Sequence, residues 1–586
     1  MVHEKFYRYE THIDKKACLV VGWTYFNDDQ TDQMPVWNEH RDVYIILAGK
    51  LFISNGDVKW IRSRGHNLPH NNYDLLVHLY EEYEEDFFEK LNGQFAGVLV
   101  DLRKKVSYLF NDRFGFGRIY YREEEGKVFF STEAKSLLMI FPDARAIDPV
   151  ALSEIFACGC TLKNRCLFKK ISILPPATLW KFEKDSQSMK YTYLSEGFVR
   201  QSEYIDRGDY YQKIKMTLQN ILPRYLEANR LIGMSITGGK DTRIILAWAD
   251  FTRTNLRCYT FGSIYRKNRD EKIAEIVAKA CGLPFSVIKV GGEFFRSFPK
   301  LAEKTIYITD GLMDVSGAPG LYTNRIARDL SPIRLTGNYG QEIFEGYVAF
   351  KPTMISEKFV NDEFMQLLRD ARSSYQEEKR NCDKYSFILL KQLPWYHYSR
   401  YKLESSQVIM YSPFLDNDLI KVISNTPLAI RQSSDYIRTR LYYEGNPVLA
   451  EIETDLGYKY CDKSLFQRLN IVFQEFTFKA EYAYNVGMPN WLAFIDYVFK
   501  PLHLEKLFLG RHKINHFRIW YRDILPDYIK EILLDKRTLS RPFINRRAVE
   551  RIVLNHTKGI RNYTFEIHQL LTMELIYRQL LEAQNS

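Results

Sequence analysis

The spacing of hydrophobic residues divides the chain into two parts that meet near residue 200. In the first part, short apolar or alternating runs recur between turn residues such as Asn55-Gly56-Asp57, a pattern typical of β-strands. A stretch at 73–91 has leucines on one side and glutamates on the other, which predicts a helix. Strands are expected at 17–23, 43–52, 97–101, 106–110, 128–131 and 178–182.

From about residue 205 the pattern changes to strands that alternate with helices. Alternation of this kind predicts a parallel sheet with helices on both faces. After about residue 360 the spacing is mostly helical. The expected strands are 231–234, 257–261, 285–290 and 333–335, with helices at 242–249 and 271–280.

Composition narrows the class of protein without naming a function. A length of 586 residues suggests about two to four domains. The net charge of +10 is modest and contains no run of Lys and Arg, so we expect no nucleic-acid partner, whereas a phosphate-bearing substrate is compatible with it. No apolar run has the length of a membrane span, and the first residues do not resemble a signal peptide. With eight cysteines in so long a chain, we expect a cytoplasmic protein without a disulfide framework and without a membrane partner.

One segment, 234–247, carries the clearest chemical signal, because it reads as a strand, a glycine loop and the start of a helix. Gly238 and Gly239 let the backbone approach a bound anion, and the helix N-terminus with Lys240 favours negative charge. Asp241 suits a Mg²⁺ ion that bridges phosphate oxygens. The alternative is a plain Gly-Gly turn between two core elements. Hydroxyl groups are available from Ser235, Thr237 and Thr242.

This loop and further motifs resemble the asparagine synthetase family. The loop is similar to the pyrophosphate loop of ATP pyrophosphatases, which release pyrophosphate after adenylating a substrate. The later motifs are Cys258-Tyr-Thr-Phe-Gly262 with Asp270-Glu271, Leu335-Thr-Gly-Asn-Tyr-Gly-Gln-Glu-Ile-Phe-Glu-Gly-Tyr347, Ser412-Pro-Phe-Leu-Asp-Asn-Asp-Leu419, Ala548-Val-Glu-Arg551 and Leu571-Thr-Met-Glu-Leu575. The first half resembles the glutaminase domain of that family through Leu91-Asn-Gly-Gln-Phe-Ala96, Asn111-Asp-Arg-Phe-Gly-Phe-Gly117 and Phe129-Phe-Ser-Thr-Glu-Ala-Lys135.

The resemblance implies a two-lobed protein of mixed α/β and α+β class. Residues 1–200 are expected to form an Ntn-hydrolase-like αββα sandwich, a degenerate class II glutaminase-like domain. Residues 201–586 are expected to form an adenine-nucleotide α-hydrolase-like (ATP pyrophosphatase) parallel sheet with many helices. Within them, 462–530 matches no part of the family and is expected to be a divergent helical insertion.

The resemblance also implies where ATP and Mg²⁺ bind. The metal is expected on Asp241 and Glu342. The phosphates are expected on Ser235, Thr237, Gly238, Gly239, Asp241 and Thr242, and the adenine near Ile236, Ile288, Thr336 and Gly337.

The first half departs from the family at its reactive position. There, a cysteine directly after the initiator Met is the glutaminase nucleophile, with its own α-amine as the base. This chain has Val2, whose isopropyl group has no nucleophilic atom, so we expect no glutaminase activity. Ala48-Gly-Lys-Leu-Phe-Ile-Ser54 also departs from the motif that holds glutamine. The alternative is that removal of 1–17 exposes Cys18 as a new start; otherwise Cys18 is expected in a buried first strand.

The second half departs more selectively. Asn338 and Gln341 replace a glutamate and an aspartate of the family; asparagine has no pKa suited to general-base work, and the lost carboxylate at 341 should weaken metal binding. Tyr339 takes part if it is positioned for it, as a tyrosine does in lactam-forming relatives. Lys459 is the nearest candidate for the late lysine of the family, which stabilises the second step.

Basic residues in and after the loop leave two interpretations open. Lys240 and Arg243 stand where the family has Leu and Ser. On the first helical turn, the Arg243 fork either reaches a phosphate or substrate carboxylate, or projects to solvent. Arg266, Lys267 and Arg269 form a basic loop that covers the nucleotide or is a solvated face.

Together these features predict an ATP-dependent amide-forming enzyme. A small-molecule or peptide carboxylate is adenylated with release of pyrophosphate, and an amine then displaces AMP. The amine is intramolecular, as in β-lactam synthetases and lasso-peptide cyclases, or is a second substrate or ammonia; a natural-product pathway fits this chemistry. The contrasting prediction is a non-catalytic scaffold that binds nucleotide or a partner, and a homodimer or a pathway-enzyme partner stays open. The candidate catalytic residues are Lys240, Arg243, Tyr339, Glu342 and Lys459.

Overall fold

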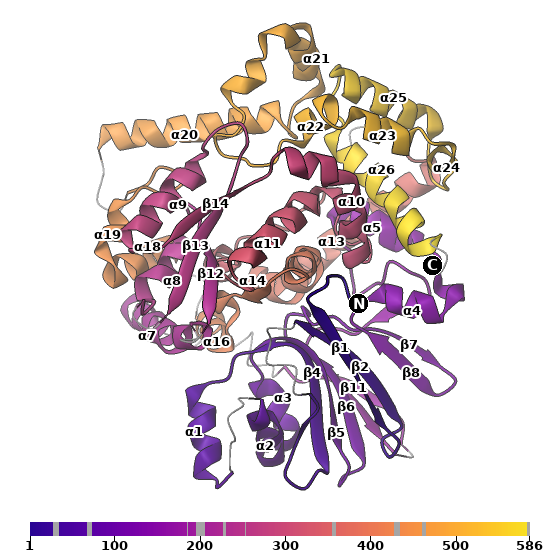
Figure 1. The fold of residues 1–586 in the computed structure, drawn as a ribbon, viewed down its shortest axis with the longest axis vertical. Coiled ribbons are helices and arrows are strands. Elements are labelled where there is room, and N and C mark those ends of the chain that lie inside the picture. The colour runs from indigo at the N-terminus through magenta and orange to yellow at the C-terminus, as the bar shows by residue number, and fades with distance from the viewer. Residues whose placement is uncertain are drawn as a thin grey trace.

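A computed structural model describes two lobes, the N-terminal one at the bottom of Figure 1 and the C-terminal one above it. The statements below concern the residues that it describes, which are 1–26, 34–66, 73–184, 186–194, 206–226, 230–251, 254–353, 359–426, 430, 434–459 and 464–582. Within these ranges, no helix combines the length and the apolar character that crossing a membrane requires.

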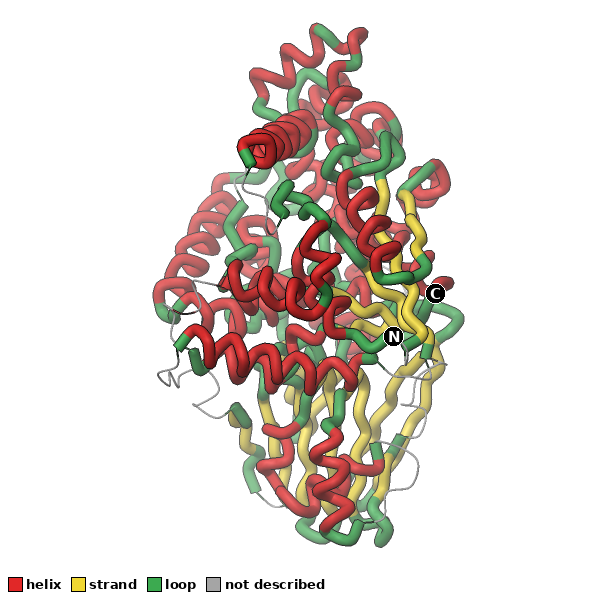
Figure 2. Tube along the Cα trace, turned by 90° about the vertical axis from the view of Figure 1, so that its left-hand side faces the viewer, coloured by secondary structure: helices red, strands yellow, loops and turns green. Residues whose placement is uncertain are grey.

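The N-terminal lobe is built on a six-stranded antiparallel sheet in the order β11-β10-β6-β5-β4-β3. Every residue of its central strand β5 is buried, because other elements cover both faces. The described β1-β2 hairpin and the β8-β7-β9 sheet form the second strand layer, and the long strands run side by side in Figure 2. The strands are β1 (Tyr7–Asp14), β2 (Leu19–Phe26), β3 (Val36–Trp37), β4 (Val43–Leu51), β5 (Gly93–Asp101), β6 (Val106–Asn111), β7 (Tyr120–Glu124), β8 (Lys127–Ser131), β9 (Ser172–Ile173), β10 (Thr178–Glu183) and β11 (Met189–Thr192).

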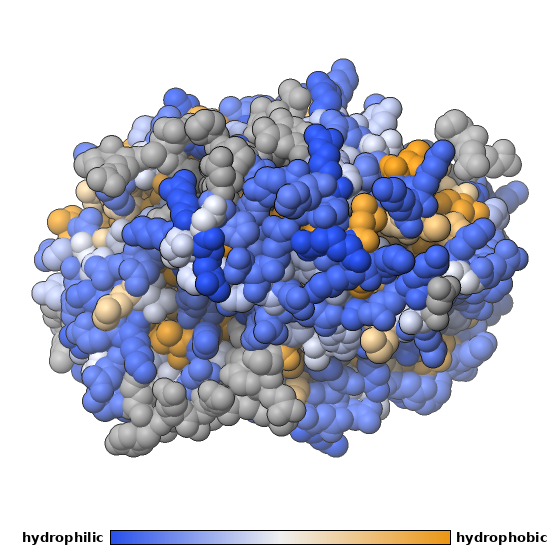
Figure 3. Space-filling model, turned by 90° about the horizontal axis from the view of Figure 1, so that it is seen from below, coloured by the Kyte–Doolittle hydropathy of each residue, from blue (hydrophilic) through white to orange (hydrophobic). Residues whose placement is uncertain are grey.

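Helices cover the outer faces of these strand layers, which gives the expected αββα arrangement. The helix expected at 73–91 is interrupted, because Glu84 has a positive φ of 50° and ends α2. The helices are α1 (Asn55–Ser63), α2 (Asp74–Tyr83), η2 (Glu84–Asp86), α3 (Phe87–Lys90), α4 (Ala134–Ile140), η3 (Pro142–Ala144) and α5 (Pro149–Cys158). The end of the molecule at which this lobe lies has a mostly hydrophilic surface (Figure 3).

The C-terminal lobe is built on a five-stranded parallel sheet in the order β14-β13-β12-β15-β16. The chain adds β13 and β14 on one side of β12 and then returns to add β15 on the other side. The described strands of the two lobes belong to separate sheets, so the expected two-lobed fold class is confirmed. The strands are β12 (Leu231–Ser235), β13 (Asn255–Gly262), β14 (Phe285–Lys289), β15 (Ile333–Thr336) and β16 (Ile409–Tyr411).

Helices surround this sheet and make up most of the chain after residue 360, as the spacing predicts. Those that connect or flank the strands are α7 (Arg207–Tyr225), α8 (Lys240–Trp248), α9 (Arg269–Ala280), α10 (Gly292–Ile308), η4 (Val315–Gly317), α11 (Ala318–Leu330) and α12 (Gly340–Glu345). Those that follow are α13 (Asp362–Arg380), α14 (Lys384–Phe387), η5 (Ile388–His397), α15 (Tyr398–Ser405), η6 (Pro413–Leu415), α16 (Asn417–Ser424), α18 (Ser434–Gly445), α19 (Pro447–Glu451), α22 (Phe517–Asp523), α23 (Pro526–Leu533), α24 (Lys536–Leu539), α25 (Arg546–Lys558), α26 (Thr564–Ile576) and η9 (Tyr577–Leu581).

The segment expected to be a divergent helical insertion, 462–530, contains helices where the structure describes it. It includes α20 (Leu465–Tyr484), α21 (Asn490–Val498), η7 (Lys500–Leu502) and η8 (Leu504–Leu507), and α20 and α21 lie at the upper end of Figure 1. Large apolar side chains are exposed along both helices, with Phe466 81% and Trp491 67% accessible.

The two lobes are joined by buried polar contacts. Asp416 is fully buried and accepts hydrogen bonds from Asn92 Nδ2 at 2.9 Å and from the Tyr225 hydroxyl at 3.0 Å. Asp310 accepts from the backbone N–H of Ala134 at 2.8 Å. Helix α5 packs against α13, so the segment around 149–158 shares the core of the C-terminal lobe.

Candidate active site

The glycine loop lies where the order in which the chain adds strands to the parallel sheet reverses. It follows β12, whose neighbours β13 and β15 were added on opposite sides, and Asn338 to Gly340 follow β15 next to it. In open α/β sheets, ligands bind in the crevice at the carboxyl ends of the strands, at this switch point. The packing is close: a Cβ added to Gly337 would lie 3.0 Å from the Thr242 backbone nitrogen.

The amide groups of the loop are only partly engaged. Gly238 N–H donates to Asp270 Oδ1 at 2.8 Å, and Gly239 N–H donates to Thr237 Oγ1 at 3.2 Å. Helix α8 has no side-chain cap from a described residue, so its first N–H groups keep their capacity to bind an anion.

Arg243 fixes the loop through hydrogen bonds to backbone carbonyls. Its side chain is fully buried, and its guanidinium donates to four backbone carbonyls, those of Gly238, Leu449, Ile452 and Glu453. Of the two alternatives for Arg243, the one in which it projects to solvent is therefore wrong. Because the guanidinium N–H groups already donate to carbonyl oxygens, Arg243 positions the loop in the described geometry and does not face a phosphate.

The segment that contains Lys459 is placed next to the loop by the same kind of contact. Asp455 N–H donates to Gly238 O at 3.1 Å, and Arg269 donates to the carbonyls of Asp455 at 2.7 Å and Thr454 at 3.0 Å. Lys459 is exposed and follows four residues later. Arg269, from the basic loop, thus fixes a neighbouring segment, while Arg266 donates to Lys506 O and Lys267 pairs with Glu275.

Asp241 lies at the centre of a charged cluster. Its Oδ1 is 2.7 Å from Arg438 Nη2, and the same guanidinium also pairs with Glu345. Burial raises the pKa of Asp241 to about 6, with Glu342 and Glu345 adding to the rise and Arg438 opposing it. A Cβ on Gly340 would lie 2.5 Å from Asp241 Cγ, so a side chain at position 340 would displace the Asp241 carboxylate.

The residues of this cluster fit a Mg²⁺ ion. Glu342 and Glu345 are carboxylates close enough to raise the pKa of Asp241, and a hard divalent cation prefers oxygen ligands. The buried hydroxyl of Thr242, next in sequence to Asp241, has no partner among the described residues, which is unusual for a buried polar atom. The cluster therefore has excess negative charge and spare oxygen atoms at the mouth of the loop.

The segment 335–347 adds aromatic and polar groups to the site. Tyr339 adopts a left-handed conformation with φ 72°, and its ring lies 5.4 Å from that of His397, whose Nε2 is 3.3 Å from Glu342 Oε1. Burial raises the pKa of Tyr339 well above 10, so the phenol stays protonated at neutral pH. Gln341 is exposed and donates to Glu345 Oε2 at 3.1 Å, whereas Asn338 O accepts from Ser412 Oγ at 3.0 Å.

The positions expected to bind the base and the remaining phosphate oxygens line the same end of the sheet. Ile236 N–H donates to Tyr259 O at 2.9 Å. Ile288 is buried on the edge strand β14, and Thr336 Oγ1 accepts from Asn338 N–H at 3.2 Å, beside Gly337. Ser235 Oγ accepts from Arg334 Nε at 3.1 Å.

Lys240 is turned toward α18. Its ammonium lies 2.5 Å from Asp435 Oδ1 and donates to Thr439 Oγ1 at 3.1 Å. A free phosphate must therefore compete with Asp435, which is 72% exposed and so offers only a weak competing pair.

Sequence reasoning missed the partners that come from distant segments. Arg438, His397, Arg334 and Asp455 contact the predicted residues across long stretches of chain. Glu345 and Asp270 carried a signal, since both belonged to motifs of the resemblance, although their contacts with Arg438 and Gly238 were not foreseen.

In the glutaminase-like lobe, the position after the initiator Met and the neighbouring cavity are described by the structure. A cavity of about 190 Å³ lies between the lobes, and no described cysteine lines it; Met1, Lys50, Arg118, Glu133 and Lys402 do. Val2 is 52% exposed. Cys18 is exposed and lies in the turn between β1 and β2, so the expectation of a buried strand position is wrong.

Comparisons with known proteins agree with this architecture. The family model described as glutamine amidotransferase domain matches residues 25–194, and the model described as asparagine synthase matches residues 213–440. The chain is similar to "Asparagine synthetase [glutamine-hydrolyzing] 3" of Bacillus subtilis (strain 168), with 26% identity over 56% of this chain and 56% of that protein. It is also similar to "Asparagine synthetase [glutamine-hydrolyzing] 1" of the same organism, with 21% identity over 57% of this chain and 52% of that protein. The chain thus spans about half the length of these relatives.

Proposed function

The chain belongs to the asparagine synthetase superfamily as a divergent member, and on that premise we propose that it joins a carboxylate to an amine with ATP. The carboxylate oxygen attacks the α-phosphorus of ATP, the bond to the β-phosphate breaks, and pyrophosphate leaves. The amine nitrogen then attacks the acyl carbon, loses a proton, and AMP leaves with the electron pair of the broken C–O bond.

One observation carries this proposal: the open N-terminus of α8 and the carboxylates around Asp241 lie together at the switch point of the sheet. A helix N-terminus attracts phosphate, and the nearby carboxylates attract the divalent cation that accompanies ATP. A plain Gly-Gly turn needs neither feature.

Asp241 and Glu342 are the residues that would hold Mg²⁺. The ion supplies positive charge that offsets the charge growing on the leaving pyrophosphate, a contribution of several kcal/mol in enzymes of this kind. Arg438 holds Asp241 and Glu345 in place from α18, and Arg243 holds the loop carbonyl of Gly238. These two arginines position the site without meeting the reacting atoms.

Tyr339 is proposed as a proton donor and not as the base. Because burial keeps its phenol protonated, it can donate a hydrogen bond to the oxyanion that forms when the amine attacks. Lys459, on the segment that crosses Gly238, is proposed to reach the same oxyanion or the departing AMP.

The amine is proposed to come from a source other than glutamine hydrolysis. No cysteine among the described residues lines the cavity between the lobes, and Cys18 lies in an exposed turn. An amine within the same substrate, a second substrate or free ammonia therefore supplies the nitrogen.

A second candidate is a non-catalytic scaffold that binds nucleotide. The pairing of Asp241 with Arg438 favours it, since an arginine that occupies the carboxylate can replace the metal. Such a protein would bind ATP with equal affinity in Mg²⁺ and in EDTA.

The experiment that tests the proposal is an assay for AMP and pyrophosphate. Purified protein is incubated with ATP, Mg²⁺, ammonia or amines and a panel of small-molecule and peptide carboxylates, and glutamine is added in a parallel series. We expect substrate-dependent release of both products, with no glutamate formed from glutamine. ATP bound but not consumed with any carboxylate, or ADP as the nucleotide product, would contradict the enzyme proposal.

A further inference from the structure

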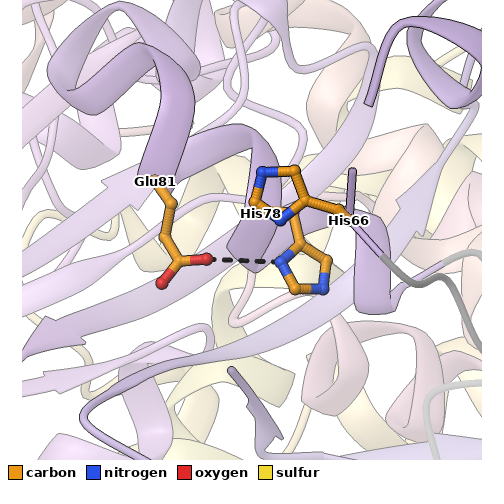
Figure 4. Close-up of side chains that lie close together, drawn as sticks. All are labelled: His66, His78 and Glu81. Atoms are coloured by element: carbon orange, nitrogen blue, oxygen red, sulfur yellow. Dashed lines mark hydrogen bonds and ion pairs between the residues drawn. The ribbon is translucent and has the colours of Figure 1, made fainter. Parts of the chain in front are cut away.

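A second group of metal-binding side chains lies in the N-terminal lobe, away from the nucleotide loop. His66 follows α1, and His78 and Glu81 lie one turn apart on α2. One ligand atom from each of the three lies within 4.8 Å of the other two. Figure 4 shows the two imidazole rings next to one another with the Glu81 carboxylate beside them; the ring centroids are 4.6 Å apart and the rings are tilted by 43°.

Two of the three side chains, His66 and Glu81, have hydrogen-bond partners outside the cluster. His66 Nε2 is 3.0 Å from Glu82 Oε1, and Glu81 Oε1 accepts from Asn38 Nδ2 at 2.8 Å and from Arg103 at 3.3 Å. Metal-binding histidines and carboxylates in proteins have such outer partners, which fix the ring and the tautomer.

The contacts of His78 are compatible with a bound cation. Its Nδ1 is 3.2 Å from Glu81 Oε2 and its Nε2 is 3.7 Å from Glu39 Oε1, so the ring lies between two carboxylates. With a cation on the Nδ1 side, Nε2–H is left to donate toward Glu39.

We propose that His66, His78 and Glu81 bind one divalent transition-metal ion of the Zn²⁺ class. Two imidazole nitrogens and one carboxylate oxygen are the ligands that Zn²⁺ accepts, with a water in the fourth position, whereas Mg²⁺ and Ca²⁺ prefer oxygen ligands alone. In a tetrahedral site, ligand atoms lie about 3.3 Å apart, close to the 3.2 Å between His78 Nδ1 and Glu81 Oε2.

The ion has a structural role. It ties the end of α1 to α2, which packs on the six-stranded sheet through buried residues such as Leu75 and Leu79. His78 is only 3% exposed, so its side of the site is shielded, and Glu39 and Glu82 add negative charge around the ion.

The test is metal binding by the full chain without a histidine tag. Protein freed of metal with a chelator is titrated with Zn²⁺ by calorimetry at neutral pH, and with Co²⁺ to record the visible bands of a tetrahedral site. We expect one ion per chain and a rise in melting temperature on binding. His66→Ala, His78→Ala and Glu81→Gln should each weaken binding by more than about a hundredfold, because losing even an outer partner costs roughly ten- to a hundredfold.

Two further variants guard against misinterpretation. His503→Ala removes an exposed histidine far from the cluster and should leave binding unchanged. Glu82→Gln removes only the outer partner of His66 and should weaken binding by roughly tenfold or more. If wild-type protein binds no Zn²⁺ or Co²⁺, or if the ion binds equally well to His66→Ala and Glu81→Gln, the proposal is wrong. Should His78→Ala fail to fold, the binding measured for His66→Ala and Glu81→Gln decides whether the proposal holds.

Discussion

Asp241 and Arg438 form an ion pair, with 2.7 Å between Oδ1 and Nη2, that links the first turn of α8 to α18 across the mouth of the nucleotide loop. Arg438 is 6% exposed at its side chain and also pairs with Glu345, so one guanidinium contacts two carboxylates. The pair holds Asp241 in the place from which it can exchange the arginine for a metal ion.

Arg438→Met should destabilise the metal-free protein. It leaves Asp241 and Glu345 without their cation, and removing one member of a buried pair costs roughly 3 kcal/mol. Mg²⁺ should then restore part of the lost melting temperature, because the ion supplies the missing charge. The control is Arg440→Met on the same helix, whose partly exposed i,i+4 pair with Glu444 is worth about 0.5 kcal/mol or less. Equal effects of the two variants would contradict the account.

The pH dependence of Mg²⁺-dependent ATP binding follows from the raised pKa of Asp241, about 6 against an ordinary value of 3.8. The proton competes with the ion, so affinity should fall as the pH drops through 6 and be level above it. For stability the sign is opposite: the contribution of Asp241 is full below 3.8 and is lost as the pH rises through about 6. Calorimetry at several pH values checks this, and an affinity that is constant between pH 5 and pH 7 would contradict it.

Gly340→Ala should impair metal-dependent nucleotide binding although it changes no charge. The added Cβ would lie 2.5 Å from Asp241 Cγ and would push the carboxylate away. We expect at least about a tenfold loss of ATP affinity in Mg²⁺, which corresponds to about 1.4 kcal/mol. Gly320→Ala is the matched control, since a Cβ there meets nothing within 4 Å on helix α11. Wild-type affinity in Gly340→Ala would show that Asp241 does not bind the ion.

Arg243→Lys should lower both stability and nucleotide affinity. Lysine keeps the charge but cannot reach four carbonyls at once, and each buried carbonyl left without a donor costs about 1–3 kcal/mol. Thermal melting and ATP titration measure the two effects, with Arg257→Lys on the exposed side of β13 as the control. A variant that melts like wild type would mean that the four bonds do not hold the loop.

The strands and the loop could be predicted because their signals are local. The apolar run at 231–234, the strand pattern at 257–261 and the glycines at 238 and 239 depend on neighbours in sequence, and β12, β13 and the loop lie where they were expected. The break at Glu84 could not be foreseen, since a positive φ at a glutamate leaves no mark on the hydrophobic spacing.

The charges that surround the loop could not be predicted from spacing, because they arrive from segments far apart in the chain. Arg438 meets Asp241 from 197 residues away, and Arg243 meets Glu453 from 210 residues away. A buried arginine and an exposed arginine have the same local sequence signal, so the burial of Arg243 could be known only from the fold.

The most direct test of the account compares ATP binding to wild-type protein and to Asp241→Asn, each in Mg²⁺ and in EDTA. The central claim is that Asp241 couples the nucleotide to the metal at the N-terminus of α8. We predict that Mg²⁺ tightens ATP binding to wild type by at least about tenfold, that Asp241→Asn loses this gain, and that it melts at or above the wild-type temperature. With the true substrate, the same variant should lose about a thousandfold in pyrophosphate release, or about 4 kcal/mol. An Asp241→Asn protein that keeps the full effect of Mg²⁺ on ATP affinity would contradict the account.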